Sequence, residues 1–487
     1  MSLDVGRRRL AIMTAVVLPA LLVGVAAAGE APPATAPGFA ALGAPTMPFV
    51  PYDGFINSTW FCAGVPMGAE GLGGSVTIAN PSDAALSGTL TAFTDAPDTD
   101  KVERAFEVPG RGSLTIDLAD VQPAGSYVSA MVEIAGGGGF VEQQAEHPDG
   151  SAVSPCSNST SATWYFADNY TLGGSKEDLV ITNPFPDDAI IDISFASDGE
   201  NDGVRRPPKL QGVPVPGYSV LIRNQDYLAK DEAVLAVSIV ASRGRVVAGR
   251  AQQYLGERQG YGMTLGSPST STTWTFADGQ NDGNFERYSI YNPGEETAVI
   301  APVFLGVNTQ DYVPPELIEI EPGRVVSLNI ADIELPTGRH AAQFQAQSDV
   351  PVVIERAITR RTDDGFITSV VRGVDANFAS SDFGYFRWSM AIGTDMALDE
   401  VLVVVNLTNV EGTVAVKALG PGGEVDIVGL EAVVLPANGV ITIAIPDVDS
   451  ALGVPLIVVG TQPIVVERLL ARGESMRGRS GSLALPG

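Results

Sequence analysis

Two short acidic stretches have the residue types and spacing of a calcium-binding turn. They are Asp198–Gly203, "DGENDG", and Asp278–Glu286, "DGQNDGNFE". Each stretch places oxygen-bearing side chains at positions one, three and five and a glycine at position six, so that alternate residues can face one cation. The candidate ligands are Asp198, Glu200, Asp202, Asp278, Gln280 and Asp282. We favour two solvated hairpin tips over a calcium site, because position three is Glu or Gln and the stretches lie at non-equivalent places in the repeats.

Two adjacent Glu-Arg pairs near the ends of apolar strands are the most enzyme-like charges. They are Glu355-Arg356 in "PVVIERA" and Glu467-Arg468 in "PIVVERL". Adjacent residues of a strand face opposite sides of its sheet, so the two charges of a pair cannot converge on one substrate atom. Two further strands of the same kind carry Glu142-Gln143 and Gly249-Arg250. We therefore predict cross-strand or interdomain ion pairs rather than a catalytic site.

The two histidines, His147 and His340, do not fit a catalytic or metal-binding arrangement. They lie far apart in the sequence, whereas a Ser-His-Asp triad or a histidine metal site needs its members side by side. The sequence also lacks HExxH, GxSxG, SxxK and phosphate-binding glycine motifs. We predict that both histidines are solvated turn residues, that calcium is the one candidate cofactor, and that the chain is not an enzyme.

The chain has two cysteines, Cys62 and Cys156. In an oxidising compartment we expect them to form one disulfide, which would join the two ends of the first repeat defined below. A redox pair or a metal site is the alternative, but it lacks the CxxC spacing and nearby histidines.

The elements that position these residues follow from four tryptophans, the only ones in the chain. Trp60, Trp164, Trp274 and Trp388 are 104, 110 and 114 residues apart. Each is followed by an asparagine that ends an apolar strand, and then by a turn with proline and glycine. The asparagines are Asn80, Asn183, Asn292 and Asn406, and the turns are Pro109-Gly110, Pro216-Gly217, Pro322-Gly323 and Pro436–Gly439. Proline follows three of the four asparagines, and leucine follows Asn406. Asn-Pro ends a strand because proline has no N–H to donate, and Pro-Gly suits a type II turn with glycine at positive φ.

Apolar residues alternate after each second turn, as at Val326, Leu328 and Ile330, which predicts strands with one buried face. A repeat of about 105–110 residues with several short strands has the size of a β-sandwich. We predict an all-β chain of four tandem β-sandwich (Ig-like) domains, at residues 57–158, 159–268, 269–380 and 381–487, arranged as a rod or arc. One buried tryptophan would anchor each core, and a sugar-stacking platform is the alternative role for these rings.

The N-terminus has the pattern of an export signal. Arg7–Arg9 precede an uncharged stretch, Leu10–Ala28, that ends in small residues suited to cleavage. The stretch is also near the length that spans a bilayer, so residues 1–28 are predicted as either a cleaved signal peptide or an N-terminal membrane-anchor helix. Residues 29–56, rich in proline, alanine and glycine, are predicted as a semi-rigid linker. We expect the rest of the chain to lie outside the cytoplasm.

The net charge of −28, from 29 basic and 57 acidic residues, excludes one class of partner. A surface of this sign repels phosphate backbones, so we expect no nucleic acid to bind.

The repeats resemble a family of exported actinobacterial proteins of unknown function with a "WYFAEG … NP … VERA" pattern. The likeness rests on "WYFADN" (Trp164–Asn169), "NP" (Asn183-Pro184) and "VIERA" (Val353–Ala357), and it extends over residues 57–487 in four copies. It departs from the pattern at Cys62, at Gly249 and in the "RWSMAIG" stretch of the fourth copy. This resemblance implies a fold and a location, but no activity.

We therefore predict a non-enzymatic structural or interaction protein of the bacterial cell envelope. Its partner would be an envelope protein or a polysaccharide, with membrane contact through the N-terminal segment if that segment is not cleaved. The alternative is a carbohydrate-binding or envelope-polymer assembly accessory protein, which requires an exposed aromatic strip such as Tyr165, Tyr170 and Tyr261.

Overall fold

The computed structural model describes residues 48–51, 57–69, 71–198, 203–256, 258–307, 315–362, 365–375, 385–393, 400–420, 423–446, 453–470 and 480–487. By its contacts the chain divides into two compact units, Met1–Pro45 and Thr46–Gly487, and every element below belongs to the second. The predicted signal or anchor, residues 1–28, and most of the linker at 29–56 lie outside the described residues. Among the described helices, none has the length and apolar character needed to cross a membrane.

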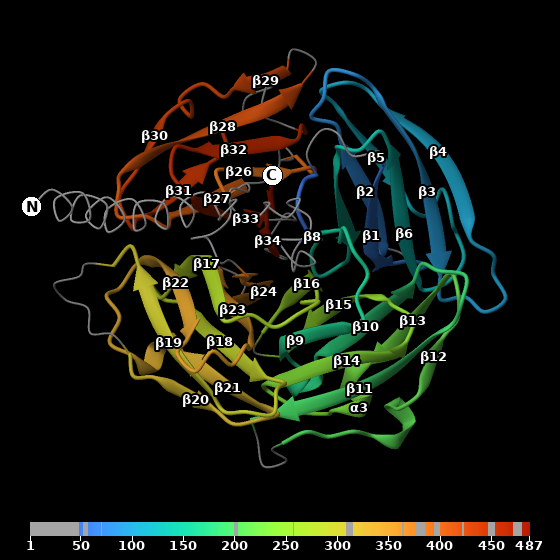
Figure 1. Ribbon diagram of the computed structural model, residues 1–487, viewed down its shortest axis with the longest axis horizontal. Helices are drawn as coiled ribbons and strands as arrows, with labels where there is room; N and C mark the ends of the chain where they lie inside the picture. The colour runs from blue at the N-terminus through green and yellow to red at the C-terminus, as the bar shows by residue number, and fades with distance from the viewer. Residues whose placement is uncertain are drawn as a thin grey trace, which may run out of the picture. The chain divides into compact units, whose positions relative to one another are not determined.

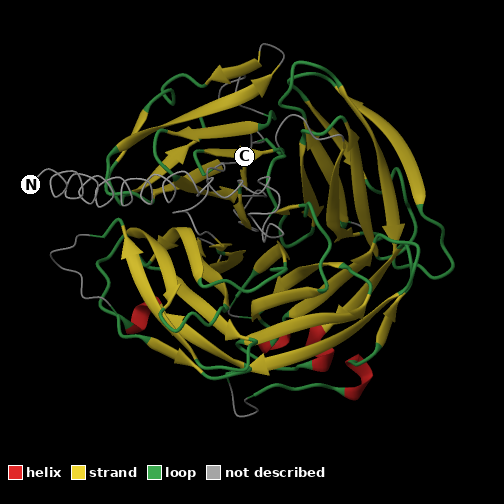
Figure 2. Cartoon of the chain, viewed as in Figure 1, coloured by secondary structure: helices red, strands yellow, loops and turns green. Residues whose placement is uncertain are grey.

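The described fold is all-β, as predicted, and is built from small antiparallel sheets (Figure 2). Helical structure in the described residues is limited to α3 (Gln225–Leu228) and the 3-10 turns η1 (Leu172–Gly174), η2 (Pro208–Leu210) and η3 (Ile330–Asp332). The strands fall into four sets, which we call repeats 1 to 4, and each set supplies two complete sheets.

Repeat 1 contains β1 (Asn57–Pro66), β2 (Gly73–Ala79), β3 (Leu86–Thr94), β4 (Val102–Val108), β5 (Ser113–Asp117), β6 (Tyr127–Ala135), β7 (Phe140–Glu146) and β8 (Ala152–Pro155). Repeat 2 contains β9 (Thr163–Asn169), β10 (Lys176–Asn183), β11 (Ala189–Ser197), β12 (Val213–Val215), β13 (Ser219–Asn224), β14 (Leu235–Arg243), β15 (Val247–Tyr254) and β16 (Gly260–Leu265).

Repeat 3 contains β17 (Thr273–Gln280), β18 (Phe285–Asn292), β19 (Ala298–Leu305), β20 (Ile318–Ile320), β21 (Arg324–Asn329), β22 (Arg339–Ala346), β23 (Val353–Thr362), β24 (Gly365–Arg372) and β25 (Val374–Asp375). Repeat 4 contains β26 (Arg387–Met390), β27 (Glu400–Asn406), β28 (Gly412–Gly420), β29 (Gly423–Asp426), β30 (Val433–Leu435), β31 (Val440–Ala444), β32 (Leu456–Gly460), β33 (Ile464–Leu470), β34 (Ser480–Leu483) and β35 (Leu485–Pro486).

All four repeats share one strand order if β29, a strand of repeat 4 that pairs with β28, is left out of the count, so that β33 is the seventh and β34 the eighth strand of repeat 4. In repeat 1 the two sheets are β1-β6-β3-β4 and β5-β2-β7-β8, and in repeat 2 they are β12-β11-β14-β9 and β13-β10-β15-β16. The third and sixth strands pair with each other, as do the second and fifth, which also holds in the immunoglobulin order. The seventh strand, however, pairs with the second rather than the sixth. The likeness to immunoglobulin domains is limited to those two shared pairs.

The four tryptophans lie inside the repeats, as predicted, and none is more than 1% exposed. Each lies within the first four residues of the first strand of its repeat and packs into an apolar cluster that draws residues from both sheets. Three indoles donate to a carbonyl at the start of the seventh strand: Trp164 to Val246 at 2.9 Å, Trp274 to Val352 at 2.9 Å and Trp388 to Ile464 at 2.8 Å. Burying an indole contributes several kcal/mol, so each ring anchors a sandwich-like core.

The asparagine that ends the second strand closes two turns at once. In repeat 1, Asn80 Oδ1 accepts from the Ser82 N–H at 2.9 Å, and its Nδ2 donates to the carbonyls of Ala84 and Pro109 at 2.8 and 3.0 Å. The same contacts recur at Asn183, Asn292 and Asn406. The side chain therefore joins its own turn to the end of the fourth strand.

The second turn follows the predicted geometry only in repeat 3, where Gly323 has φ +70° after Pro322. In repeats 1 and 2 the positive φ falls one residue later, on Arg111 and Tyr218. The glycines that precede these two residues are required because of close packing, not because of a positive φ. A Cβ on Gly110 would lie 2.0 Å from the Asp83 carbonyl oxygen. These two glycines allow the second turn to approach the Asn-Pro turn.

Within the unit Thr46–Gly487 the repeats contact one another in a closed cycle, so the predicted open rod or arc was wrong. The first strand of each repeat packs on the seventh strand of the next: β1 on β15, β9 on β23, β17 on β33 and β26 on β7. The eighth strands also meet in a cycle, β8 with β16, β16 with β24, β24 with β34 and β34 with β8. Figure 1 shows repeat 4, in red, beside repeat 1, in blue.

The end of the predicted linker takes part in this closure. The Val50 N–H donates to the Pro486 carbonyl at 2.7 Å, in the last strand of repeat 4, and the Phe49 N–H donates to Asn158 Oδ1 at 2.6 Å. Residues 49 and 50 are thus bound to the repeats and do not act as a spacer.

Cys62, on β1, and Cys156, just after β8, form a disulfide, as predicted. The bond spans 94 residues and joins the first and last strands of repeat 1. Both cysteines are fully buried in the core of that repeat.

Candidate functional site

The residues proposed for calcium do not share an environment. Glu200 and Asp202 lie outside the described residues, and Asp198 accepts from the Ser327 hydroxyl at 3.4 Å. Asp282 is exposed in the turn after β17. The described part of the chain has no group of three or more His, Cys, Asp or Glu side chains placed to hold a metal ion.

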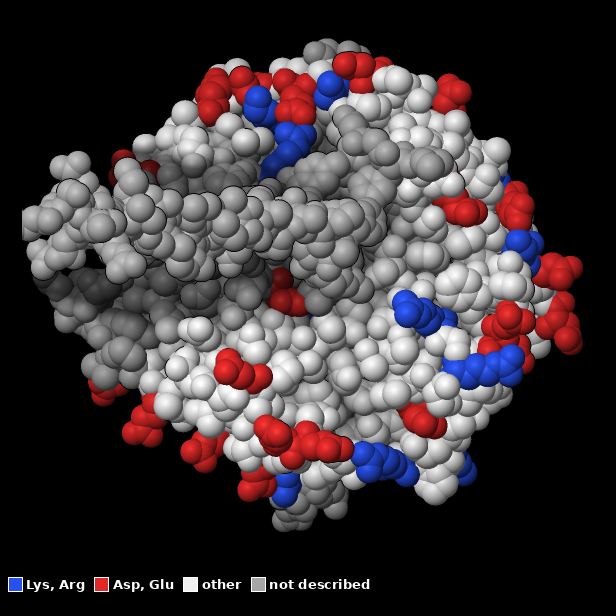
Figure 3. All heavy atoms as spheres, viewed as in Figure 1, with Lys and Arg blue, Asp and Glu red and all other residues white. Residues whose placement is uncertain are grey.

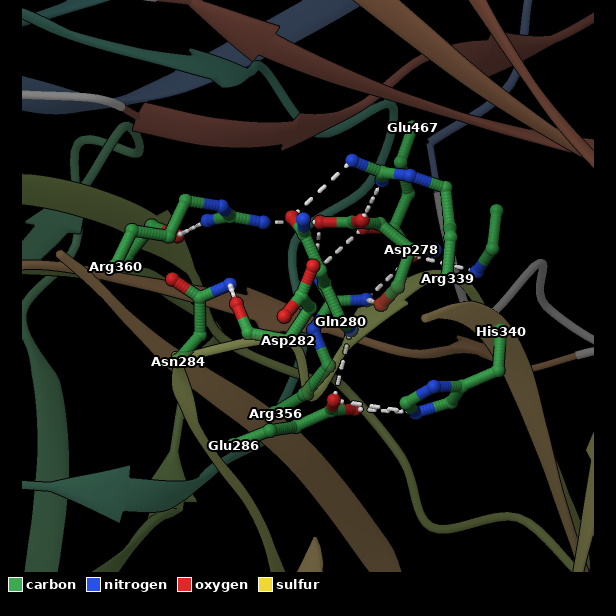
Figure 4. Close-up of polar contacts among 12 residues, drawn as sticks. Asp278, Gln280, Asp282, Asn284, Glu286, Arg339, His340, Arg356, Arg360 and Glu467 are labelled. Atoms are coloured by element: carbon green, nitrogen blue, oxygen red, sulfur yellow. Dashed lines mark hydrogen bonds and ion pairs between the residues drawn. The ribbon is translucent and has the colours of Figure 1, made fainter. Parts of the chain in front are cut away.

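Asp278 lies in a buried cluster of ion pairs at the end of β17 (Figure 4). Its carboxylate is bound by the guanidinium groups of Arg339 and Arg360, and Arg356 lies 3.7 Å away. Burial alone would raise the pKa of Asp278, but the arginines, led by Arg360, lower it below its usual value. A carboxylate already held by these cations favours the ion-pair role over the calcium role, and calcium binding stays a prediction.

Gln280 belongs to the same cluster, on the other side of Asp278. Its side-chain oxygen accepts from Arg339 at 3.3 Å, and its N–H donates to Glu286 at 2.9 Å. Gln280 therefore stabilises the turn after β17 through hydrogen bonds within repeat 3.

The Glu-Arg pairs form contacts between repeats, as predicted, and their geometry is best seen between repeats 2 and 3. One oxygen of Glu355, on β23, accepts from the N–H groups of Ala167 and Asp168, on β9, at 2.8 and 2.7 Å. Arg250, on β15, donates to both carboxylate oxygens at 3.3 and 3.2 Å and also to the Asp168 carbonyl. Both charged groups are 1% exposed.

The same contact recurs at two further junctions. Between repeats 3 and 4, Glu467 accepts from the N–H groups of Ala277 and Asp278 at 2.7 and 3.3 Å, and from Arg356 at 3.1 and 2.7 Å. Between repeats 4 and 1, Glu142 accepts from the Ile392 N–H at 2.9 Å and from Arg468 at 3.0 Å. In each case the later repeat, counted around the cycle, supplies the glutamate and the earlier one the arginine.

The junction between repeats 1 and 2 has no such pair. Gly249 stands where the glutamate would be, and a Cβ built on it would lie 2.6 Å from the Ala63 Cβ of repeat 1. Gln143, in place of the arginine, accepts from the Gly64 N–H of its own repeat at 3.1 Å. Close backbone packing therefore replaces the ion pair here.

The opposite directions of the two side chains explain why the motif is repeated. Glu355 points out of its sandwich, toward repeat 2, whereas Arg356 points to β17 of its own repeat and meets Glu467 from repeat 4. One dipeptide thus contacts both neighbouring repeats. The carboxylate of Glu467 accepts four hydrogen bonds, three at Oε1 and one at Oε2.

Three buried carboxyl groups were missed: Asp168, which lies 2.6 Å from Arg287, and Glu177 and Glu286, which lie in ordinary strand sequence. Glu177 and Glu286 each stand six residues before the strand-ending asparagine of their repeat. Glu286 lies 3.1 Å from His340 Nε2 and accepts from the Tyr288 hydroxyl. Glu177 accepts from the Tyr170 N–H at 3.2 Å, and burial raises its pKa to about 8 although the Arg250 cation opposes this. The spacing from the asparagine is the one signal that could have revealed Glu177 and Glu286.

The prediction for the histidines was wrong for His340, which is fully buried on β22. His147, between β7 and β8, is half-buried and stacks on Tyr261 of repeat 2 with 4.3 Å between ring centroids. Both rings therefore pack within the unit.

The aromatic strip required for carbohydrate binding is absent at the proposed residues. Tyr170 and Tyr261 are buried, and Tyr165 is half-buried. On the face of the molecule in Figure 3, acidic side chains are spread along the edge with basic ones among them. This pattern agrees with the net charge of the chain.

Comparisons with known proteins agree with the resemblance to a family of unknown function. Residues 140–381, just under half of the chain, match a family of unknown function (DUF5719). No curated protein matches the chain. The solved structure of Thermotoga maritima 1070 is 22% identical, with 22% of this chain and 97% of that chain covered and a TM-score of 0.20. Streptomyces avermitilis α-L-rhamnosidase complexed with L-rhamnose is 7% identical, with 81% and 55% covered and a TM-score of 0.13. With TM-scores this low, neither likeness bears on fold or function.

Proposed function

We propose that the chain is an exported, non-catalytic structural or interaction protein of a bacterial cell envelope. The observation that carries this proposal is that the glutamates of the repeated motif bind neighbouring repeats. Glu142, Glu355 and Glu467 are buried and bound to a neighbouring repeat, so the most enzyme-like residues of the sequence stabilise the assembly.

The disulfide and the N-terminal sequence support the location. A buried disulfide persists in oxidising compartments, and the basic and apolar N-terminal segment has the pattern of an export signal. The acidic balance favours protein, polysaccharide or cationic partners over nucleic acid. The buried tyrosines leave the carbohydrate-binding alternative without its proposed platform.

Fractionation of a bacterial host that produces the full chain tests the location. We expect the protein in the envelope or the medium, with Cys62 and Cys156 inaccessible to thiol labelling until reduced. A variant that lacks residues 1–28 is the control, and it should stay in the cytoplasm with labelled thiols. Full-length protein in the cytoplasm with reduced cysteines would overturn the proposal.

Capture from an envelope extract, together with a glycan array, tests the role. Retention of an envelope component by the exported chain supports an interaction role. Turnover of an envelope substrate by the exported chain would contradict the non-catalytic assignment, and its loss in the Glu355→Gln variant would also contradict the structural role of Glu355.

A further inference from the structure

A small cavity lies where the eighth strands of all four repeats meet. Residues from β8, β16, β24 and β34 line it, and its volume is about 30 Å³. Its walls are mainly apolar, from residues such as Val153, Met263 and Leu483. The one charged side chain in the lining is Arg372, on β24.

Arg372 stands where the other repeats have an apolar residue. In the pairing of β23 with β24, Arg372 lies opposite the motif residue Glu355. In the other three repeats, the eighth-strand residue opposite the same motif position is apolar: Pro155, Leu265 or Leu483. The strand pairing itself therefore does not require an arginine here.

The charge of Arg372 has no ion-pair partner among the described residues. Its side chain is 6% exposed, and its one hydrogen bond in this part of the chain goes to the Gly266 carbonyl at 3.0 Å. Burial lowers the pKa of Arg372 to about 10, although Asp375 and Glu355 oppose this from beyond ion-pair distance. The Glu355 carboxylate is already occupied by Arg250 and two backbone N–H groups. A buried charge is costly without a counter-charge, and the described residues supply none at ion-pair distance from Arg372, while the cavity beside it has room for a counter-ion.

We propose that this cavity binds one small monovalent anion, a halide or the carboxylate of a small acid, with the Arg372 guanidinium as its main ligand. A cavity needs roughly 10–15 Å³ to hold one water, so about 30 Å³ gives room for a small anion such as chloride or a carboxylate group. Ser154 and Ser482 also belong to the lining, and each of their hydroxyl groups donates to a strand carbonyl, that of Pro155 or Leu483, at 3.3 Å.

Such an anion would stabilise the closed cycle, because it binds where all four repeats converge. A ligand that binds only the folded state raises stability with its concentration. Chloride and the other small anions should therefore raise the melting temperature of the intact chain.

Thermal melting at constant ionic strength tests the site, with gluconate as the balancing anion. We expect chloride or acetate, raised from 1 to 100 mM, to increase the melting temperature by about 2 °C or more. The response should be lost in Arg372→Leu, which places the residue of repeats 2 and 4 in repeat 3. Arg361→Leu, at an exposed arginine of β23, is the matched control and should keep the response.

Crystals soaked in bromide give a second readout that does not depend on a stable variant. An anomalous peak in the cavity beside the Arg372 guanidinium supports the site. No peak there, or a melting response to chloride and acetate that is absent or equal in Arg372→Leu, overturns it.

Discussion

Replacement of Glu355 by glutamine should destabilise the unit by about 3–5 kcal/mol, although the two side chains have the same shape. Arg250 donates to the two carboxylate oxygens at 3.2 and 3.3 Å, and both groups are 1% exposed. At an effective dielectric constant of about 20 and this distance, the Coulomb attraction is about 5 kcal/mol. The amide keeps one acceptor for the backbone N–H groups, but it presents N–H donors to a guanidinium left without its counter-charge.

Urea unfolding measures this effect as the change in the free energy of unfolding. Glu103→Gln is the matched control, because Glu103 pairs with Lys101 at the surface and is 57% exposed. A surface pair contributes about 0–1 kcal/mol, so the control should change little. The double variant Arg250→Met/Glu355→Gln should lose less than the sum of its single variants by about 2 kcal/mol, because it removes both charges together.

Equal destabilisation by Glu355→Gln and Glu103→Gln would refute the structural role of the pair. Additive losses in the double variant would refute the direct ion pair as the cause. Either result would return the motif glutamate to the list of candidate functional residues.

Three further outcomes follow from single positions. Because the pKa of Glu177 is raised to about 8 in the folded chain, its contribution to the free energy of unfolding is complete below about pH 4.5 and is lost as the pH rises toward about 8. Urea unfolding at several pH values should show this decline in stability for the native chain and a flatter one for Glu177→Gln. Trp60 has no hydrogen-bond partner for its indole N–H among the described residues, so Trp60→Phe should cost about 1 kcal/mol less than Trp164→Phe in the same assay. Gly249→Ala should destabilise the unit by about 1–3 kcal/mol, because the new methyl group meets Ala63; a neutral result would show that the first junction is loosely packed.

The repeat could be predicted from the sequence because its landmarks are local. A buried tryptophan, an Asn-Pro turn and a period-two strand each impose a geometry within a few residues, and all of them occur where expected. Their recurrence at near-constant spacing set the number of repeats. The disulfide followed from the presence of two cysteines at the two ends of one repeat.

The closure of the cycle could not be predicted, because it depends on contacts between distant segments. Glu142 and Ile392 are 250 residues apart, and no local pattern indicates that they meet. The sequence did show that Glu and Arg of a pair face opposite sides, but not that each side contacts a different repeat. The calcium hypothesis at Asp278 relied on spacing within one turn, whereas the arginines that hold this residue come from two other strands.

Amide hydrogen exchange at Ile392 tests most directly whether repeat 4 closes on repeat 1. In the native chain this N–H donates to the buried Glu142 carboxylate at 2.9 Å, so we expect slow exchange. Glu142→Ala should make Ile392 exchange much faster, while the Ala277 amide, bound in the same way to Glu467, keeps its protection. Fast exchange of Ile392 in the native chain, or unchanged protection in Glu142→Ala, would contradict the closed cycle of repeats.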